Sequence, residues 1–181
     1  MFEWMHDKNV TEYLNTDFSS KGLSDCEDFI RESQSDDKCV HLAITNDDNE
    51  YMGTVSLKHI QGTAAEFGIA IRTVAMGKGY SKAAMYEILN RAFNEYNLSS
   101  VYWCVNANNQ RALRFYDHNG YKRISPKHLN LGGGIPKNRF NSLFGIKPQE
   151  TRWGTVSKHL YPDTKGKYYF LLSKKEGRKI G

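Results

Sequence analysis

Hydrophobic positions recur with two different spacings along this chain of 181 residues. Apolar residues alternate with polar ones over Val40–Ile44, Tyr51–Ile60 and Glu66–Ile71, which is typical of β-strands. Asp47-Asp48-Asn49 supplies a turn between the first two segments, and Gly62 supplies one between the second and the third. Three strands joined by short turns predict an antiparallel meander.

Apolar spacings of three and four predict helices on both sides of this meander. A short helix is expected over Lys8–Asn15. A second is expected after Ser24, whose side chain would form a capping box with Glu27. Two longer helices are predicted after the meander, from about Tyr80 to Tyr96 and from Asn109 to His118.

The rest of the pattern completes an α+β fold. Three further strands are predicted, at Val101–Val105, Tyr121–Ile124 and Lys167–Leu172. Residues 125–166 show little periodicity, and we interpret them as a long basic loop before the last strand. We therefore expect a mixed, mostly antiparallel central sheet flanked by about four helices. A single domain would cover residues 1–173, followed by a basic C-terminal tail at 174–181.

Composition narrows the classes of function. The chain lacks an apolar run of the ~18 residues that a membrane helix needs, and its start does not resemble a secretion signal. We therefore expect a cytoplasmic protein without a membrane partner. Cys26, Cys39 and Cys104 are scattered, which favours buried free thiols over disulfides or zinc. The six histidines show no metal-ligand spacing, so no metal is expected.

Charge is distributed unevenly. Residues 1–50 contain 13 acidic and 4 basic residues, a net charge of −9, whereas residues 51–181 have a net charge of +14. A basic half favours a polyanionic partner, either a nucleic acid or a cofactor rich in phosphate. Charge alone does not separate these two classes.

A glycine-containing turn, Met76-Gly77-Lys78-Gly79-Tyr80-Ser81, lies where a predicted strand ends and a helix begins. Free N–H groups at a helix N-terminus converge on an anion, and the helix dipole adds to the attraction. The dinucleotide fingerprint would need a glycine where Lys82 stands. The nucleoside-triphosphate loop would need a glycine where Arg72 stands. The turn thus predicts another kind of phosphate site.

Taken together, these residues resemble the GNAT superfamily of acetyl-CoA-dependent N-acyltransferases. The resemblance runs from about Tyr51 to Ile124 and rests on blocks that occur in the family's order. These blocks are Glu66 on a strand, the Gly77-Lys78-Gly79-Tyr80 turn, the strand Val101–Val105, the helix Asn109-Gln110-Arg111-Ala112-Leu113-Arg114-Phe115-Tyr116, and the exit Asn119-Gly120-Tyr121. Met76 and Ser81 depart from the family's usual residues. The segment from Trp4 to Val10 is similar to the branch that contains ribosomal-protein N-acetyltransferases, with the first strand reduced or missing.

The resemblance implies acetyl-CoA (coenzyme A) as co-substrate and direct transfer of the acetyl group in a ternary complex. Glu66 is the candidate base, acting directly or with a water chain in its place, because it shares a strand face with the small residues Gly68 and Ala70. Tyr116 would be the acid that protonates the departing thiolate. The expected cofactor-binding residues are Ile69, Ala70, Ile71, Met76, Gly77, Lys78, Gly79, Tyr80, Ser81, Asn109 and Tyr116.

The acceptor stays open between several primary amines. Basic residues in the 125–166 loop, namely Lys127, Lys137, Arg139, Lys147 and Arg152, favour an amino sugar or sugar nucleotide. The alternatives are a small amine, a peptide, or a protein N-terminus as in the ribosomal-protein enzymes. Two further hypotheses are a module that binds nucleic acid or the ribosome through the basic half and a non-catalytic module that binds acyl-CoA, although nucleic acid is not the expected partner. A homodimer is also left open.

Overall fold

The computed structural model describes residues 1–125, 162–163 and 165–174 of the chain. Most of the expected basic loop, including Lys127, Lys137, Arg139, Lys147 and Arg152, lies outside the described residues. So does the expected tail beyond Lys174. The described residues group into two compact units. The first comprises Met1–Ile60 and Glu66–Tyr96, and the second comprises Gln61–Ala65 and the residues from Asn97 onward.

Five α-helices and one 3-10 helix occur in the described part of the chain. They are α1 (Phe2–Met5), α2 (Lys8–Thr11), α3 (Leu23–Ser33), η1 (Thr73–Ala75), α4 (Tyr80–Asn94) and α5 (Gln110–His118). The helix expected over residues 8–15 is shorter than predicted, and α1 precedes it. The capping prediction for α3 was wrong by two residues. The helix begins at Leu23, and the carboxylate of Asp25, not of Glu27, accepts a hydrogen bond from the Gly22 N–H at 2.7 Å.

Six strands form a mostly antiparallel sheet in the order β1-β2-β3-β4-β6-β5. Their bounds are β1 (Val40–Thr45), β2 (Tyr51–Gln61), β3 (Ala64–Ile71), β4 (Ser100–Asn106), β5 (Arg123–Ile124) and β6 (Lys167–Ser173). The first 39 residues contain helices and no strand, as the reduced first strand predicts. With helices and sheet in one chain, the α+β fold class is confirmed.

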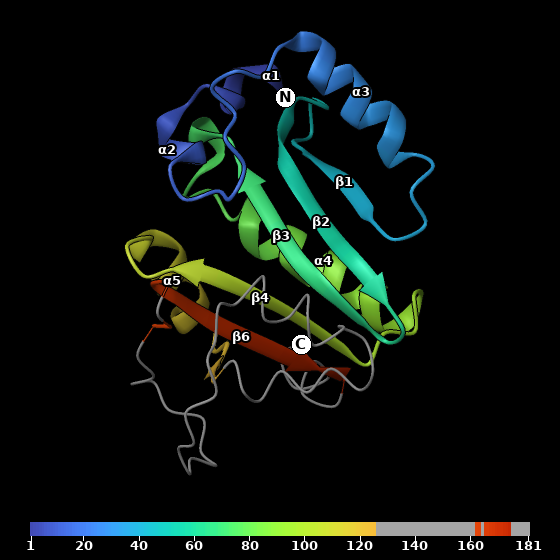
Figure 1. Cartoon of the computed structure of the whole chain (residues 1–181), viewed down its shortest axis with the longest axis vertical. Helices are drawn as coiled ribbons and strands as arrows, with labels where there is room; N and C mark the ends of the chain where they lie inside the picture. The colour runs from blue at the N-terminus through green and yellow to red at the C-terminus, as the bar shows by residue number, and fades with distance from the viewer. Residues whose placement is uncertain (126–161, 164, 175–181) are drawn as a thin grey trace. The chain divides into compact units, whose positions relative to one another are not determined.

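In the first unit, β1, β2 and β3 run as neighbouring strands (Figure 1). β1 pairs antiparallel with β2, and Leu42 lies opposite Val55. The turn predicted at residues 47–49 is present, since the Asn49 N–H donates to the Asn46 carbonyl at 3.0 Å. The turn between β2 and β3 needs a left-handed residue, and Gly62 supplies it with a φ of 58°. The predicted meander is therefore present.

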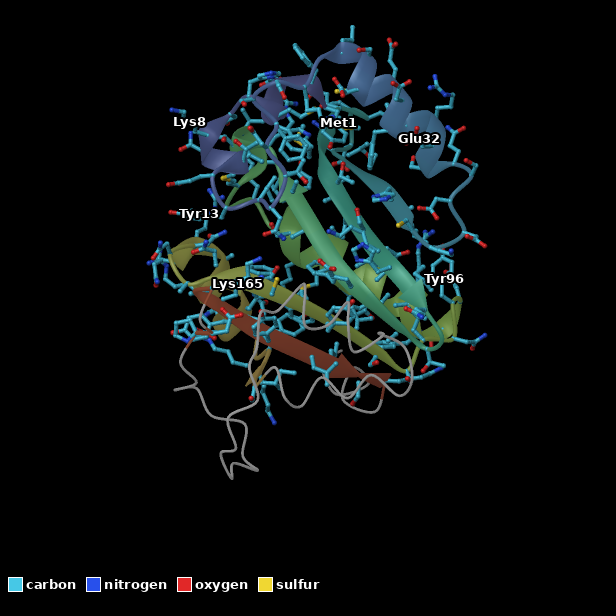
Figure 2. The ribbon with its side chains drawn as sticks, viewed as in Figure 1. Met1, Lys8, Tyr13, Glu32, Tyr96 and Lys165 are labelled. Carbon is cyan, nitrogen blue, oxygen red and sulfur yellow. The ribbon has the colours of Figure 1, made fainter. Side chains whose placement is uncertain are left out.

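The N-terminal helices of the first unit have a small core of their own. Trp4, Met5, Val10 and Cys26 are buried together, and Met1, Leu14, Phe18, Tyr51, Ala70 and Met76 pack against them. By contrast, α3 keeps its charged face in solvent, as the exposed side chain of Glu32 illustrates (Figure 2). This core holds the N-terminal segment against the end of β3 and the residues that follow it.

In the second unit, β6 pairs antiparallel with β4 along its whole length (Figure 1). The short β5 pairs with β6 on its other side, and Arg123 lies opposite Phe170. The Arg123 guanidinium stacks on the Tyr168 ring at 4.4 Å and pairs with Asp117. The strand expected over residues 121–124 is thus reduced to its last two residues.

Candidate active site

The predicted phosphate turn has the backbone geometry that an anion site needs. Gly77 and Gly79 have φ values of 75° and 89°, in the left-handed region that glycine adopts without strain. Gly79 is the N-terminal cap of α4, and the first turn of this helix contains no acidic residue. The positive end of the helix dipole is therefore available to an anion.

Several N–H groups of this turn have no partner among the described residues. The N–H groups of Lys82 and Ala83 both donate to the Gly79 carbonyl, and that of Lys78 donates to Ala75. The remaining N–H groups belong to Gly77, Gly79, Tyr80 and Ser81. Consecutive N–H donors in a turn with left-handed residues make a concave anion site, and the exposed Lys78 and Lys82 add positive charge. The turn therefore fits a ligand that carries phosphate.

The N-terminal segment forms hydrogen bonds with residues that directly precede this turn. Arg72, directly after β3, donates to the Tyr51 carbonyl at 2.8 Å and pairs with Glu3 at 2.6 Å. The hydroxyl of Thr73 donates to the carboxylate of Asp7, the residue that also caps α2. Both contacts join the start of the chain to residues far along it. They fix the backbone that leads from β3 into the turn.

The segment of β3 that contains the expected cofactor-binding residues Ile69, Ala70 and Ile71 lies close to β2. A Cβ atom added at Gly53 would stand 2.3 Å from the Ala70 carbonyl oxygen, so only glycine fits there. Ile71 is buried, while Ile69 and Ala70 are half-buried. The packing of Ala70 and Met76 against the N-terminal core shows that these two side chains support the structure. Any contact they make with a cofactor would come from their backbone.

Glu66 lies in a cluster with two basic residues of β2. Its Oε1 atom is 3.6 Å from Lys58 Nζ, and its Oε2 atom is 3.0 Å from His59 Nδ1. The Glu66 side chain is 17% exposed, against 41% for His59. The carboxylate therefore sits deeper than the imidazole, and each of its oxygens has a cationic or hydrogen-bonding partner.

A backbone irregularity allows both basic residues to reach the same carboxylate. Successive side chains of a regular strand point to opposite faces, so Lys58 and His59 would normally diverge. His59 has a φ of 51°, which is uncommon for a residue with a Cβ atom. This left-handed residue interrupts the alternation of β2. As a result, two consecutive side chains converge on Glu66.

The open face that the sequence predicts beside Glu66 is partly filled. A Cβ atom on Gly68 would lie 3.0 Å from Lys58 Cε and 3.2 Å from its Nζ atom. The lysine side chain thus lies over the backbone of Gly68, where the sequence predicts room for a ligand. Glycine at this position lets Lys58 lie flat and reach the carboxylate.

Asn109, in the second unit, begins α5. Its Oδ1 atom accepts a hydrogen bond from the Ala112 N–H at 3.0 Å, and its own N–H donates to the Asn106 carbonyl at 2.9 Å. The asparagine therefore caps the helix, which explains its spacing from Ala112 in the predicted signature. Its contact with a cofactor stays a prediction.

Tyr116, on the buried face of α5, is surrounded by aromatic rings. Its ring centroid lies 5.3 Å from that of Trp103 and 5.1 Å from that of Phe170. Burial raises the pKa of the Tyr116 hydroxyl well above its usual value near 10, and nearby Tyr121 and Cys104 raise it further. The phenol therefore keeps its proton throughout the neutral range and is able to donate a hydrogen bond.

The three cysteines are free, but only Cys26 is fully buried. Cys104 is half-buried and packs against the cluster of Ala64, Tyr102 and Tyr169, which agrees with a structural thiol. The described residues contain no group of three or more histidine, cysteine, aspartate or glutamate side chains that could hold a metal ion. In the same residues, no helix combines the length and hydropathy that a membrane crossing requires.

The structure thus brings together some predicted residues and adds others. In the first unit it joins Met76, directly before the turn Gly77–Ser81, to the N-terminal helices, and Glu66 to Lys58 and His59. In the second it places Asn109 and Tyr116 at the start and on the buried face of α5. The sequence analysis missed Lys58 and His59 as partners of Glu66. Pairing the two predicted strands across the Gly62 turn would have placed this part of β2 beside Glu66, but not both side chains on the same face.

Comparisons with known proteins bear on the family and the fold of the chain. The family model described as "Acetyltransferase (GNAT) domain" matches residues 1–122, which include every predicted site residue. No curated protein matches the sequence at a significant level.

Solved structures share the fold at low sequence identity. A spermidine N-acetyltransferase from Vibrio cholerae in complex with CoA and spermine has a TM-score of 0.67 and 14% identity, covering 98% of this chain and 89% of that one. A chimeric spermidine N-acetyltransferase from Vibrio cholerae has a TM-score of 0.63 and 15% identity, covering 98% and 92%. The Vibrio cholerae spermidine/spermine enzyme with manganese ions has a TM-score of 0.56 and 15% identity, covering 87% and 78%. With the family model matching about two thirds of its length, this chain belongs to the GNAT acetyltransferase family.

Proposed function

We propose that the protein transfers the acetyl group of acetyl-CoA to a primary amine, with both substrates bound at once. The observation that carries this proposal is the turn Gly77–Ser81, whose free N–H groups and helix dipole fit a phosphate-bearing ligand. This turn lies inside the region that the GNAT family model matches. A phosphate site in this family points to the pyrophosphate of CoA.

The backbone around the turn would bind the rest of the cofactor. The N–H groups of Gly77, Gly79, Tyr80 and Ser81 would hold the pyrophosphate, and the turn's lysines would screen its charge. The N–H groups of Ile69 and Ile71 would hold the pantetheine arm, and one of them would donate to the thioester oxygen as negative charge develops there. The N-terminal core that packs on Ala70 and Met76 keeps this backbone in place.

Tyr116 would assist departure of the thiolate as a hydrogen-bond donor. A thiol has an ordinary pKa of about 8.5. Because burial raises the pKa of Tyr116 above 10, full loss of its proton to the sulfur would be uphill. A hydrogen bond from the neutral phenol to the leaving sulfur stabilises the developing charge without that cost.

A proton acceptor is needed on the amine side, because an ammonium group has no lone pair for attack. Glu66 is the carboxylate that the sequence predicts for this role. Glu66 lies on β3 beside Lys58 and His59 of β2. This cluster contains side chains that would accept or release a proton.

For the acceptor, we propose a polyamine such as spermidine. The solved structures with the same fold are spermidine and spermine N-acetyltransferases, which does not support the amino sugar expected from the sequence. The basic residues behind that expectation lie outside the described residues. In addition, the first 50 residues have a net charge of −9, and this acidic segment would attract a polycation to the molecule.

The proposal is tested with the purified full chain, acetyl-CoA and a panel of amines, measuring released thiol and the mass of the acetylated product. The panel contains spermidine, spermine, an amino sugar nucleotide and a peptide with a free N-terminus. We expect turnover, highest with the polyamines. Preferred acetylation of the amino sugar or peptide would reject the polyamine proposal. Absence of turnover with every amine, despite bound acetyl-CoA, would reject catalysis.

A further inference from the structure

We propose that His59 is the catalytic proton acceptor for the amine and that Glu66 is a positioning residue that acts through it. This inference rests on the proposed acetyl transfer and reassigns its base. The two side chains form a carboxylate–imidazole pair, with 3.0 Å between Glu66 Oε2 and His59 Nδ1.

The chemistry of the pair fixes the tautomer of the imidazole. An ionised carboxylate only accepts hydrogen bonds, so the proton of the contact lies on His59 Nδ1. In the neutral ring, Nε2 then has the free lone pair and is the atom that takes a proton. The Nε2 atom has no hydrogen-bond partner in the part of the chain that the structure describes.

The exposed fractions of the His59 and Glu66 side chains differ, and this difference suggests separate roles for them. The His59 side chain is 41% exposed, whereas that of Glu66 is 17% exposed. An incoming amine therefore meets the imidazole more readily than the carboxylate. Each Glu66 oxygen also has a partner already, since Lys58 Nζ lies 3.6 Å from Oε1. Glu66 is placed to orient His59 and to stabilise the imidazolium that forms.

The backbone at His59 gives independent support. A residue with a Cβ atom at a φ of 51° carries a conformational cost, and such residues cluster at functional sites. The strained position turns the ring onto the same face as Glu66, which regular alternation along β2 would prevent.

The proposed step balances as follows. The ammonium group gives one proton to His59 Nε2, which later releases it to water. The nitrogen lone pair forms the N–C bond to the thioester carbonyl carbon, and the C–S bond breaks with its electron pair going to sulfur. The second proton of the nitrogen ends on the sulfur. The products are the acetamide, the free thiol and one proton in solution.

The test compares three variants of the full chain with the wild type. His59→Asn keeps an N–H donor for Glu66 and suits the left-handed backbone, but removes the Nε2 base. Glu66→Gln removes the charge that positions the ring. The double variant tests whether the two residues act as one unit. His6→Asn, on an exposed histidine outside the site, is the matched control.

We expect His59→Asn to lower kcat/KM for the amine about 100-fold or more at neutral pH, with unchanged affinity for acetyl-CoA. The loss should shrink towards pH 10, where solution itself supplies the unprotonated amine. Glu66→Gln should cost less, and the double variant should be no worse than His59→Asn alone. His6→Asn should match the wild type.

The pH profile gives a readout that a structural role would not move. The groups that face His59 are Glu66 and Lys58, together with the Cys39 thiol, which accepts from the His59 N–H and also contacts Asp36. If kcat/KM fell at low pH in His59→Asn in the same way as in the wild type, the proposal would be overturned. A Glu66→Gln loss that equals or exceeds that of His59→Asn would also overturn it. Inactivity of the wild type with all amines would instead reject the proposed function.

Discussion

Glu66 and Tyr116 are the two side chains for which the sequence predicts chemistry, and their surroundings give them different tasks. Glu66 is engaged by Lys58 and His59, so its carboxylate is suited to orient a neighbour. Tyr116 is packed among aromatic rings, so its phenol stays neutral and is suited to donate a hydrogen bond. Residue type alone suggests a base and an acid, and from these contacts we propose a positioning role for Glu66 and a hydrogen-bonding role for Tyr116.

Replacing Tyr116 with Phe removes one hydroxyl and keeps the ring that packs against Trp103 and Phe170. We expect kcat to fall about 10- to 100-fold, as for loss of one hydrogen bond to a developing charge. Acetyl-CoA affinity and melting temperature should change little. Steady-state kinetics and thermal melts measure these effects.

Because burial raises the pKa of Tyr116 above 10, the phenol should not lose its proton between pH 6 and 9. Its titration should therefore cause no change in wild-type kcat over this range. Tyr121→Phe, which changes a half-buried neighbouring ring without touching Tyr116, is the control for general loosening of the aromatic cluster. If Tyr116→Phe retained full kcat, or lost no more than Tyr121→Phe, the assignment of Tyr116 to the leaving sulfur would fail.

The contacts of some residues could be predicted from the sequence, and those of others could not. Asn109 was predictable, because its capping of Ala112 is local and produces a fixed spacing along the helix. Lys58 and His59 were not recognised, because their meeting with Glu66 depends on strand pairing and on the left-handed φ of His59. A local pattern thus indicated the start of α5, although it misplaced the start of α3 by two residues, and no local pattern indicates the interruption of strand alternation at His59.

At the scale of elements, the turn before α4 combines a rigid backbone with exposed donors. Gly77 and Gly79 supply the left-handed residues, and Arg72 and Thr73 tie the preceding backbone to the N-terminal helices. Binding of an anion here would therefore depend on the backbone of this turn and its supports rather than on one side chain.

Gly79→Ala tests the turn directly. Alanine in the left-handed region costs about 1–2 kcal/mol, and relief of this strain would reorient the N–H groups that converge on phosphate. We expect acetyl-CoA affinity to fall at least about 10-fold, as measured by calorimetric titration. Nothing lies within 4 Å of the added Cβ atom, so a clash would not explain the result.

Gly62→Ala is the matched control for this experiment. Gly62 also has a positive φ and open space around its position, but it lies in the turn between β2 and β3. We expect a comparable loss of stability without a loss of acetyl-CoA affinity. Equal affinity losses in the two variants would show that general destabilisation, not the phosphate turn, governs binding.

The sequence predicted the positions of the helices and strands better than it predicted their first and last residues. Strands β1, β2 and β4 and helix α4 appear where the apolar spacing predicts them, since their cores depend on burial of one face. Their ends depend on particular hydrogen bonds. The α3 helix begins early because Asp25 accepts from the Gly22 N–H, and β5 is short because only Arg123 and Ile124 pair with β6.

At the scale of the whole molecule, the sequence predicts the family from several motifs that are each weakly specific but occur in a fixed order. The glycine turn, the strand that follows α4 and the capped α5 helix occur in the order that the GNAT family has, within residues 1–122. The acceptor could not be predicted in this way. Amine recognition depends on the shape and charge of an assembled site, whereas the basic segment 125–166 suggested an acceptor from charge alone.

The central claim is that this chain binds acetyl-CoA as its acyl donor. The most direct measurement is the thermal and chemical stability of the full chain with and without acetyl-CoA. A ligand at 100 times its dissociation constant stabilises a folded protein by about 2.7 kcal/mol, and we expect a shift of this size with acetyl-CoA. With affinity lowered about 10-fold, the shift of Gly79→Ala at the same concentration should fall to about 1.4 kcal/mol. An unchanged stability of the wild type at millimolar acetyl-CoA would contradict the account.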